Sequence, residues 1–315
     1  MIASFLAWLG RYGTQCFALS IMLGLALPQF SAAARPLLPV AIFCFTLIVF
    51  LRADFGVIAG LVRRPARLIA TCLWLIAVPP LMIAIAFALV GREAMDPGLV
   101  LGIAILGSAP PIMSAPAVAI IYGFEPSLMI AGVIVTTILC PIVAPISVEW
   151  LAGAAVPLDL MVLTMRLLIF IGGGMTAAFV LRYWLGRQRI VELKPNLDGF
   201  GVLMYFVFAI AAMDGVTHAA IERPGLVASF LAVVFAISAA GLGLSYLLLR
   251  ILRPSERFMI GYGTGQRNMG LLIAALGAGV PPTTFLFFAL AQFPIYLLPW
   301  LLGGIAARIR RGETG

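Results

Sequence analysis

Long apolar stretches follow one another along almost the whole chain, and they constrain its fold more than any motif does. A stretch of about 18 or more mainly apolar residues is long enough to cross a bilayer as a helix. About ten such stretches can be counted, separated by short turns that contain charged residues, proline or glycine. The composition agrees, because 63% of the residues are hydrophobic, only 10% are charged and the mean hydropathy is +1.15. The sequence therefore predicts an all-α polytopic membrane protein.

The expected spans are similar in length and leave little chain between them. They cover roughly residues 13–30, 36–51, 67–90, 98–122, 127–151, 158–184, 199–216, 226–249, 257–279 and 283–307. Because the loops are too short for a soluble domain, residues 1–315 are expected to form one integral membrane domain. Segment 1–12 contains Arg11 and has no small-residue cleavage site, so we do not interpret it as a signal peptide.

The basic residues predict the orientation of these spans. With the N-terminus in the cytoplasm, fifteen of the 20 Lys and Arg residues fall on that side, and Arg35, Arg92 and Arg223 fall outside. Arg166 and Arg267 lie within spans. This bias favours a protein integral to the cytoplasmic (inner) membrane with both termini in the cytoplasm. It also accounts for the net charge of +8, so the charge does not call for a nucleic-acid partner.

A polar, glycine-rich stretch interrupts the ninth expected span. It reads GYGTGQRNMG over residues 261–270. A charge at mid-membrane costs about 2.5–3.5 kcal/mol, so it is rarely kept without a use. Glycine frees the backbone from helical geometry, and non-helical backbone at this depth must be buried in protein or line a watery cavity. We interpret the stretch as a broken helix at a binding site, with its backbone shaped by Gly263, Gly265 and Gly270.

The fourth expected span is interrupted at the corresponding place. Its sequence GSAPPIMSAP contains Pro110, Pro111 and Pro116, which remove three backbone donors within seven residues. Ten spans divide into two sets of five. Because each set has an odd number of spans, the second set starts on the opposite side of the membrane and is inverted relative to the first. Interrupted helices at matching positions are typical of inverted-repeat transporters with a site near the midplane. The sequence thus predicts a 5+5 repeat, about residues 1–151 and 158–307, with broken helices 4 and 9 crossing.

The motifs in this order resemble the bile acid:sodium symporter superfamily. The resemblance rests on GSAPP, YGFEPSL, VTTILCPIVAP and GTGQRNMGL, and it covers nearly the whole chain. It implies a core domain of spans 3 to 5 and 8 to 10 and a panel domain of spans 1, 2, 6 and 7. It also implies a secondary transporter that binds a small organic solute, expected to be an organic anion, between core and panel and moves it by alternating access. Neither an enzyme activity nor a cofactor is expected.

Several positions depart from the sodium-coupled members of that family. Ala115 and Pro116 stand where those members have a Ser-Asn pair, and Gly263 stands where they have a glutamate. Arg267 and Trp74 replace glutamines. Most of the oxygen ligands for sodium are therefore missing, and a hard cation needs several of them. Sodium coupling is not expected from what remains, and the candidate ion ligands left are Thr136, Thr137 and Asn268.

The candidate substrate-binding residues cluster at the two interruptions. They are Arg267, Asn268, Gln266, Met113 and Ser114. The guanidinium of Arg267 presents a planar fork of donors that suits a carboxylate or sulfonate. Alternatively, those donors serve the structure by binding backbone carbonyls at the broken helix ends or a carboxylate such as Asp214.

The other polar residues have structural interpretations. Arg166 and Asp214 are expected to reach the interface or to pair with each other, and the single histidine, His218, to have a structural or interfacial role. The four cysteines lie in four different spans and show neither disulfide nor metal-ligand spacing; they are Cys16, Cys44, Cys72 and Cys140.

Other functions remain as alternatives. A passive channel or a non-transporting membrane sensor would also be helical, and function must be argued from the site rather than from the fold. A membrane enzyme would need a nucleophile with its base or a metal set near the crossover. Arsenite permeases of the same superfamily use a cysteine in the broken fourth helix, and no cysteine lies between Gly98 and Tyr122.

The orientation can be tested by labelling single cysteines in a cysteine-free background. Because basic residues collect on the cytoplasmic side, cysteines at positions 93 and 222 should react with an impermeant reagent added to intact cells. Cysteines at positions 187 and 253 should react only after the cells are opened. Labelling of position 187 from outside would contradict the proposed topology.

Overall fold

The computed structural model describes residues 2–11, 13–53, 65–153 and 159–314. These residues are almost entirely helical, and they contain no strand beyond one isolated backbone bridge. Seven helical stretches within them are long and apolar enough to cross a bilayer, namely Pro28–Arg52, Pro65–Val90, Ser127–Ala152, Leu160–Gly186, Lys194–Glu222, Pro224–Leu248 and Pro282–Leu301. The chain is thus an all-α polytopic membrane protein, as its sequence predicts.

The other three expected spans are shorter or divided helices. The first expected span, residues 13–30, is shorter in the structure, because α2 (Gly13–Ala26) ends at Ala26 and a new helix, α3 (Pro28–Ala34), begins at Pro28. Proline is favoured in the first turn of a helix. From α3 the apolar stretch continues through the 3-10 turn η1 (Arg35–Leu37) into α4 (Leu38–Arg52). The fourth and ninth expected spans each consist of two short helices.

The chain divides into two compact units according to which Cα atoms lie near one another. Unit 1 consists of Met1–Ala53, Met165–Ala228 and Ile273–Val280. Unit 2 consists of Asp54–Thr164, Ser229–Leu272 and Pro281–Gly315. Each unit therefore combines segments that are far apart in the sequence.

In unit 1, one long helix packs along several others. The helices are α1 (Ile2–Arg11), α2, α3, α4, most of α10 (Leu160–Glu192), α11 (Lys194–Ala212) and α12 (Val216–Glu222), and α11 packs along α1, α2 and α4. Two ion pairs join its helices, since Arg35 binds Asp214 at 2.9 Å and Arg52 binds Asp198. Gly186 has a φ of 74° and interrupts the regular helix of α10.

Of the two roles expected for Arg166 and Asp214, reaching the interface or pairing with each other, the mutual pairing is wrong. Arg166 Nη1 instead donates to the carbonyls of Ala275 and Leu276, at 3.0 Å each, while Asp214 accepts from Arg35. Those two carbonyls belong to the last turn of α15 (Met269–Leu276), where no further helical N–H can reach them. A guanidinium supplies the missing donors there.

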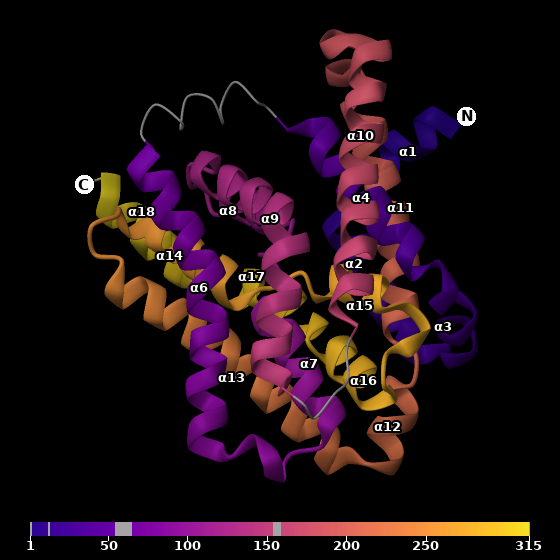
Figure 1. Cartoon of the computed structure of the whole chain (residues 1–315). Helices are drawn as coiled ribbons and strands as arrows, with labels where there is room; N and C mark the ends of the chain where they lie inside the picture. The colour runs from indigo at the N-terminus through magenta and orange to yellow at the C-terminus, as the bar shows by residue number, and fades with distance from the viewer. Residues whose placement is uncertain (1, 12, 54–64, 154–158, 315) are drawn as a thin grey trace. The chain divides into compact units, whose positions relative to one another are not determined.

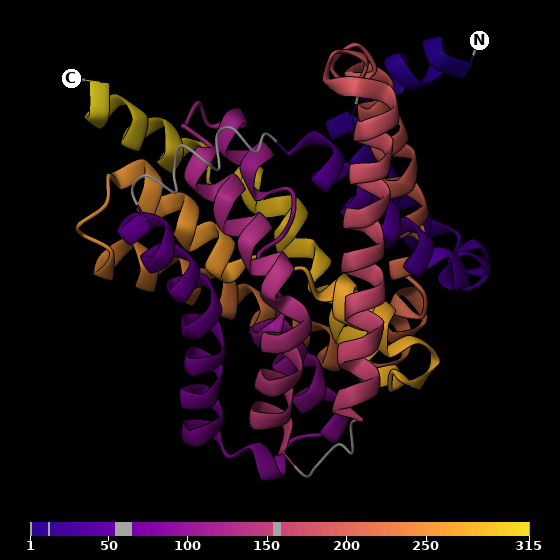
Figure 2. The same ribbon diagram turned by 45° about the horizontal axis from the view of Figure 1, so that its top comes forward.

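Unit 2 holds both divided helices. Its first elements are α6 (Pro65–Val90), η2 (Arg92–Ala94), α7 (Pro97–Ser108), α8 (Ala115–Ile121) and α9 (Ser127–Ala152). It continues with most of α13 (Pro224–Leu248), α14 (Pro254–Gly265), the first half of α15, α16 (Pro282–Leu290), α17 (Gln292–Leu301) and α18 (Gly303–Thr314). The 3-10 turn η4 (Gly277–Gly279), which follows α15, belongs to unit 1. Figures 1 and 2 show α6 running beside α9, and α7 packs against α9 and α16. The apolar α7 is therefore enclosed by its neighbours and buried over nearly its whole length.

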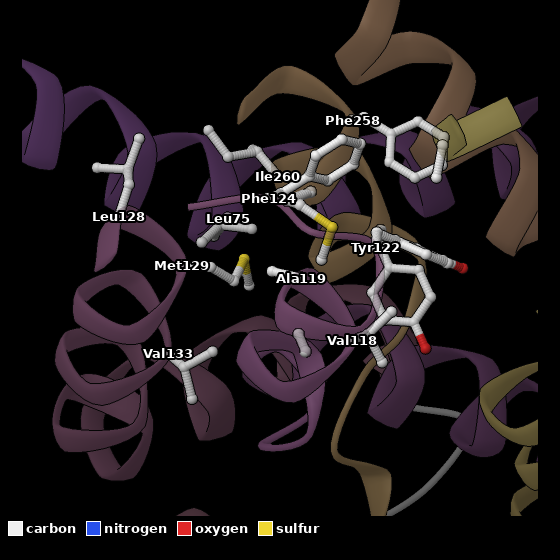
Figure 3. Close-up of a cluster of buried hydrophobic side chains, with 14 residues drawn as sticks. Leu75, Val118, Ala119, Tyr122, Phe124, Leu128, Met129, Val133, Phe258 and Ile260 are labelled. Atoms are coloured by element: carbon white, nitrogen blue, oxygen red, sulfur yellow. The ribbon is translucent and has the colours of Figure 1, made fainter. Parts of the chain in front are cut away.

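An apolar cluster holds α8 and α14 together beside α9 (Figure 3). The rings of Tyr122, Phe124 and Phe258 meet edge to face with centroids 5.9 to 6.0 Å apart, an arrangement that aromatic rings favour. Met129 from α9 packs into the same cluster. The Tyr122 hydroxyl donates to the Pro299 carbonyl at 2.9 Å, so its polar tip is also satisfied.

Helices α13 and α14 approach each other so closely that glycine is needed where they touch. A Cβ atom on Gly265 would lie 2.5 Å from the Ser238 carbonyl oxygen, and one on Gly261 would lie 2.8 Å from the Leu242 carbonyl oxygen. These neighbours are backbone atoms and cannot move aside easily. Small residues thus set the spacing of two membrane helices.

The substitution Gly265→Ala should therefore destabilise the protein by about 1–3 kcal/mol, the usual cost of forcing a side chain into packed surroundings. Gly243→Ala on α13 is the matched control, because nothing lies within 4 Å of the added Cβ and alanine favours a helix. Thermal unfolding in detergent measures both. Equal midpoints for the two variants would show that the close approach of α13 and α14 is not needed.

Candidate functional site

Both interruptions predicted from the sequence are present, and each divides a helix in two. α7 ends at Ser108 and α8 begins at Ala115, while α14 ends at Gly265 and α15 begins at Met269. The two intervening segments are short and non-helical. Without partners, their backbone groups would be left unsatisfied away from water.

The two interruptions satisfy each other through an antiparallel backbone bridge between Pro111 and Arg267. The N–H of Ile112 donates to the carbonyl of the residue just before Arg267 at 2.9 Å. The N–H of Asn268 donates to the carbonyl of the residue just before Pro111 at 2.8 Å. Segments more than 150 positions apart are thereby joined at one point inside unit 2.

The residues around the bridge explain why the helices stop there. Pro110 and Pro111 cannot donate to the preceding turn, so α7 ends before them. Pro116 lies in the first turn of α8, where the absent N–H costs nothing. Gly265 ends α14, and Gly270 lies buried in the first turn of α15.

The predicted substrate residues differ in how far they are exposed. Gln266 and Arg267 are buried, with 2% and 3% of their surface accessible. Asn268 is half-buried and is the only position between residues 258 and 275 that is not fully buried. Met113 and Ser114 are also half-buried. Of the predicted substrate residues, Asn268, Met113 and Ser114 are therefore partly accessible, as is Ile112 between the two helices, whereas Gln266 and Arg267 are buried.

Arg267 has one hydrogen bond to the protein. Its Nη1 donates to the Gly263 carbonyl in the last turn of α14, at 3.2 Å, while its Nε has no partner among the described residues. No carboxylate forms an ion pair with it in the described parts of the chain. The side chain thus caps a helix end, one of the two roles considered from the sequence, and still has a free donor.

A small cavity lies against this arginine. Its volume is about 10 Å³, counted as the space open to the centre of a water molecule, and it is lined by Leu75, Ile76, Ser108, Ala109, Pro110, Thr136, Cys140, Val143 and Arg267. These residues come from α6, α7, α9 and both interruptions, the one after α7 and the one before α15. The space is about one water-sized sphere, too small for an organic solute.

The two candidate threonine ligands lie on α9. The Thr136 hydroxyl lines the cavity and donates to the Gly132 carbonyl at 2.7 Å, which leaves only its lone pairs for another group. Thr137 is 1% exposed, and its hydroxyl has no partner among the described residues. The third candidate ion ligand, Asn268, uses its backbone N–H in the bridge.

Three positions that carry sodium ligands in the resembling family serve packing here. Trp74 Nε1 donates to the Ser245 hydroxyl at 2.8 Å. Ala115 is fully buried, and a Cβ on Gly263 would lie 2.4 Å from the Met129 Cε atom. None of these three side chains offers an oxygen atom.

Sequence reasoning did not identify two residues that line the cavity. Ser108 is buried, and its hydroxyl has no hydrogen-bond partner within the described parts of the chain. Cys140 lies one helical turn after Thr136 on α9. The spacing of four residues between Thr136 and Cys140 was a signal that both share a helix face. Among the described residues, no group of three or more His, Cys, Asp or Glu side chains comes together as a metal site would require.

Comparisons with known proteins add no family assignment. No model of a protein family matches the chain, and no curated protein matches it either.

Proposed function

We propose that this protein is a secondary transporter that moves a small organic anion across the inner membrane by alternating access. The observation that carries the proposal is the pair of interrupted helices joined by a backbone bridge in unit 2. Non-helical backbone at membrane depth is costly, and transporters use it to place helix ends and polar groups at a central binding site. The motif order that resembles the bile acid:sodium symporter superfamily supports the same function.

The charge at the crossover supports an anionic substrate. Arg267 is a buried cation with no carboxylate partner among the described residues. Asn268, Met113 and Ser114 are the accessible groups beside it. An anion bound at these residues within about 6–8 Å of the guanidinium would gain roughly 2–3 kcal/mol at an effective dielectric constant near 20. In the proposed site, Asn268 binds the solute directly and Arg267 supplies the positive potential.

Alternating access requires at least two bodies, and the division of the chain into two compact units supports it. Unit 2 gathers most of the segments that the resembling family assigns to its core, and unit 1 gathers most of those assigned to the panel. The short segment Ile273–Val280 is one exception, because it joins unit 1.

Sodium is not part of the proposed mechanism. A sodium ion in the small cavity would lie beside the Arg267 guanidinium, where repulsion between two unit charges about 4 Å apart costs roughly 4 kcal/mol at an effective dielectric constant of 20. The side chains around it offer few free oxygen atoms to offset that cost. Exchange of anions or coupling to protons would drive the transport instead.

The anion proposal predicts that purified protein distinguishes a carboxylate from its neutral amide. In a thermal-shift screen of matched pairs, such as benzoate with benzamide and butyrate with butyramide, only carboxylates should stabilise the protein. The same pairs with Arg267→Gln should show carboxylate affinity reduced about tenfold or more, since the positive charge is gone. Asn268→Ala should weaken binding and keep the charge preference. A carboxylate that binds should then show saturable counterflow in proteoliposomes, which a channel would not give.

Two results would count against this proposal. Equal stabilisation by carboxylates and amides would remove the argument for an anionic substrate. Uptake that does not saturate and is not stimulated by solute on the opposite side would favour a passive channel.

Replacing sodium with choline should have little effect on stability or uptake. Because Trp74, Ala115 and Gly263 carry no side-chain oxygen at the positions where the resembling family has sodium ligands, no saturable sodium dependence is expected. The comparison uses sodium chloride against choline chloride, so that ionic strength and chloride stay constant. A steep, saturable rise with sodium would mean that other oxygen atoms rebuild the ion sites.

A further inference from the structure

A groove lies between the ends of α6 and α9, away from the crossover. α6 ends at Val90 and α9 ends at Ala152, and the two helices run side by side toward the same end of unit 2 (Figures 1 and 2). The groove has a volume of about 350 Å³, which is within the range of small-molecule pockets. It is therefore large enough for an organic ligand, unlike the cavity beside Arg267.

Most of the groove is apolar, and small side chains leave it open. Ala84 and Ala88 line it from α6, where residues four positions apart share one face of the helix. Trp150 lines it from α9 and is half exposed. Phe87 and Leu151 also line it and are buried. The space left between the two helices thus suits a hydrocarbon chain.

The position of the groove along the helices places it next to lipid headgroups. Each helix has 26 residues and is apolar enough to cross a bilayer. At 1.5 Å per residue such a helix is about 39 Å long, which exceeds the hydrocarbon thickness of about 30 Å, so its ends reach the headgroup region. Ile85, Leu89 and Ile146 nearby are exposed, as expected of a surface that faces lipid. Tryptophan is enriched at this depth, which agrees with the position of Trp150.

Two residues of opposite charge stand at the end of the groove. Gly91, with a φ of 83°, turns the chain after α6, and Arg92 and Glu93 follow it and line the groove. Arg92 Nη1 donates to the Leu151 carbonyl at 3.0 Å, which fixes the guanidinium at the last turn of α9. Within the described parts of the chain, neither Arg92 nor Glu93 forms an ion pair. Both side chains are exposed and available to a ligand.

This pair of charges is complementary to a zwitterionic headgroup. A guanidinium binds phosphate through parallel N–H donors, and a carboxylate accepts hydrogen bonds from a primary ammonium group. Phosphatidylethanolamine carries these two groups two carbon atoms apart, so they can reach two adjacent side chains. An anionic headgroup without an ammonium group would also bind Arg92, but Glu93 would repel it. The charges thus select a zwitterionic phospholipid over an anionic one.

We propose that the groove binds one molecule of phosphatidylethanolamine. Its phosphate binds Arg92, its ammonium group binds Glu93, and one acyl chain lies between α6 and α9 beside Trp150. The bound lipid joins the ends of the two helices and stabilises unit 2. The site depends on the membrane location of these helices and not on the proposed transport.

The test uses purified full-length protein from which lipid has been removed in detergent. Phosphatidylethanolamine and phosphatidylglycerol with identical oleoyl chains are titrated separately, and native mass spectrometry counts the lipids bound. One phosphatidylethanolamine should bind per chain about fivefold or more tightly than phosphatidylglycerol, as one exposed charge pair would give. It should also raise the unfolding midpoint to a plateau. Because the two lipids differ only in the headgroup, the preference reports on the charged end of the groove.

A charge substitution tests the role of Glu93. Glu93→Gln removes the partner of the ammonium group, so the affinities for the two lipids should become equal within about twofold. Glu149→Gln is the matched control, because it removes an exposed carboxylate near the end of α9 that does not line the groove. It should keep the preference for phosphatidylethanolamine.

A steric substitution tests the location of the acyl chain. Ala88→Phe puts a ring into the groove and should weaken the binding of phosphatidylethanolamine about tenfold, because the chain loses apolar contact. Ala86→Phe is its control, since residue 86 is exposed on the same helix but does not line the groove. It should leave the affinity unchanged. Arg92→Gln should weaken the binding of both lipids.

Equal affinity for the two lipids in the unchanged protein, or tighter binding of phosphatidylglycerol, would overturn the proposal. Binding that is the same in Ala88→Phe and Ala86→Phe would place the lipid elsewhere on the protein. If Arg92→Gln does not fold for lack of its bond to α9, Glu93→Gln and Ala88→Phe still decide, because both residues are exposed. None of these results alters the carboxylate and counterflow tests, so the lipid site and the transport proposal fail or stand separately.

Discussion

Hydrogen bonding of backbone inside an apolar protein is the constraint on which this structure depends. In the bilayer core there is no water to satisfy a free N–H or C=O group, so a broken helix needs a partner for every group that it releases. The segments around Pro111 and Arg267 provide those partners for each other through an antiparallel bridge. Neither interruption could be buried alone. The two breaks are therefore one structural feature, although the chain reaches the second only after several further helices.

Close packing of the neighbouring helices supports that feature. Glycines let α14 approach α13 to a distance at which any side chain would meet backbone, and an aromatic cluster that includes Tyr122 and Phe258 holds α14 against α8. Because its neighbours are fixed, the crossover can place a charged residue at a defined position. This rigidity allows Arg267 to cap α14 through Gly263 and to border the small cavity at the same time.

The charge of Arg267 is the electrostatic basis of the proposed transport. A cation at this position disfavours a bound sodium ion and favours an organic anion at the half-buried residues of the crossover. The positions that offer sodium ligands in the resembling family hold Trp74, Ala115 and Gly263, each of which is used in packing. In the proposed function, the missing oxygen ligands and the arginine have one electrostatic explanation, in which the arginine takes the place of a bound cation.

The sequence by itself determined the class of the protein and the location of both interruptions. Hydropathy and the backbone limits of proline and glycine act locally, so Pro110, Pro111 and Gly265 could be interpreted without knowing their neighbours. Only the tertiary structure decided which groups meet. It left Asn268 half-buried while burying its neighbour Arg267. It also paired Asp214 with Arg35 rather than with Arg166, and it placed Ser108 in the lining of the cavity. Such partners depend on which helices pack together, and no local pattern in the sequence encodes that choice.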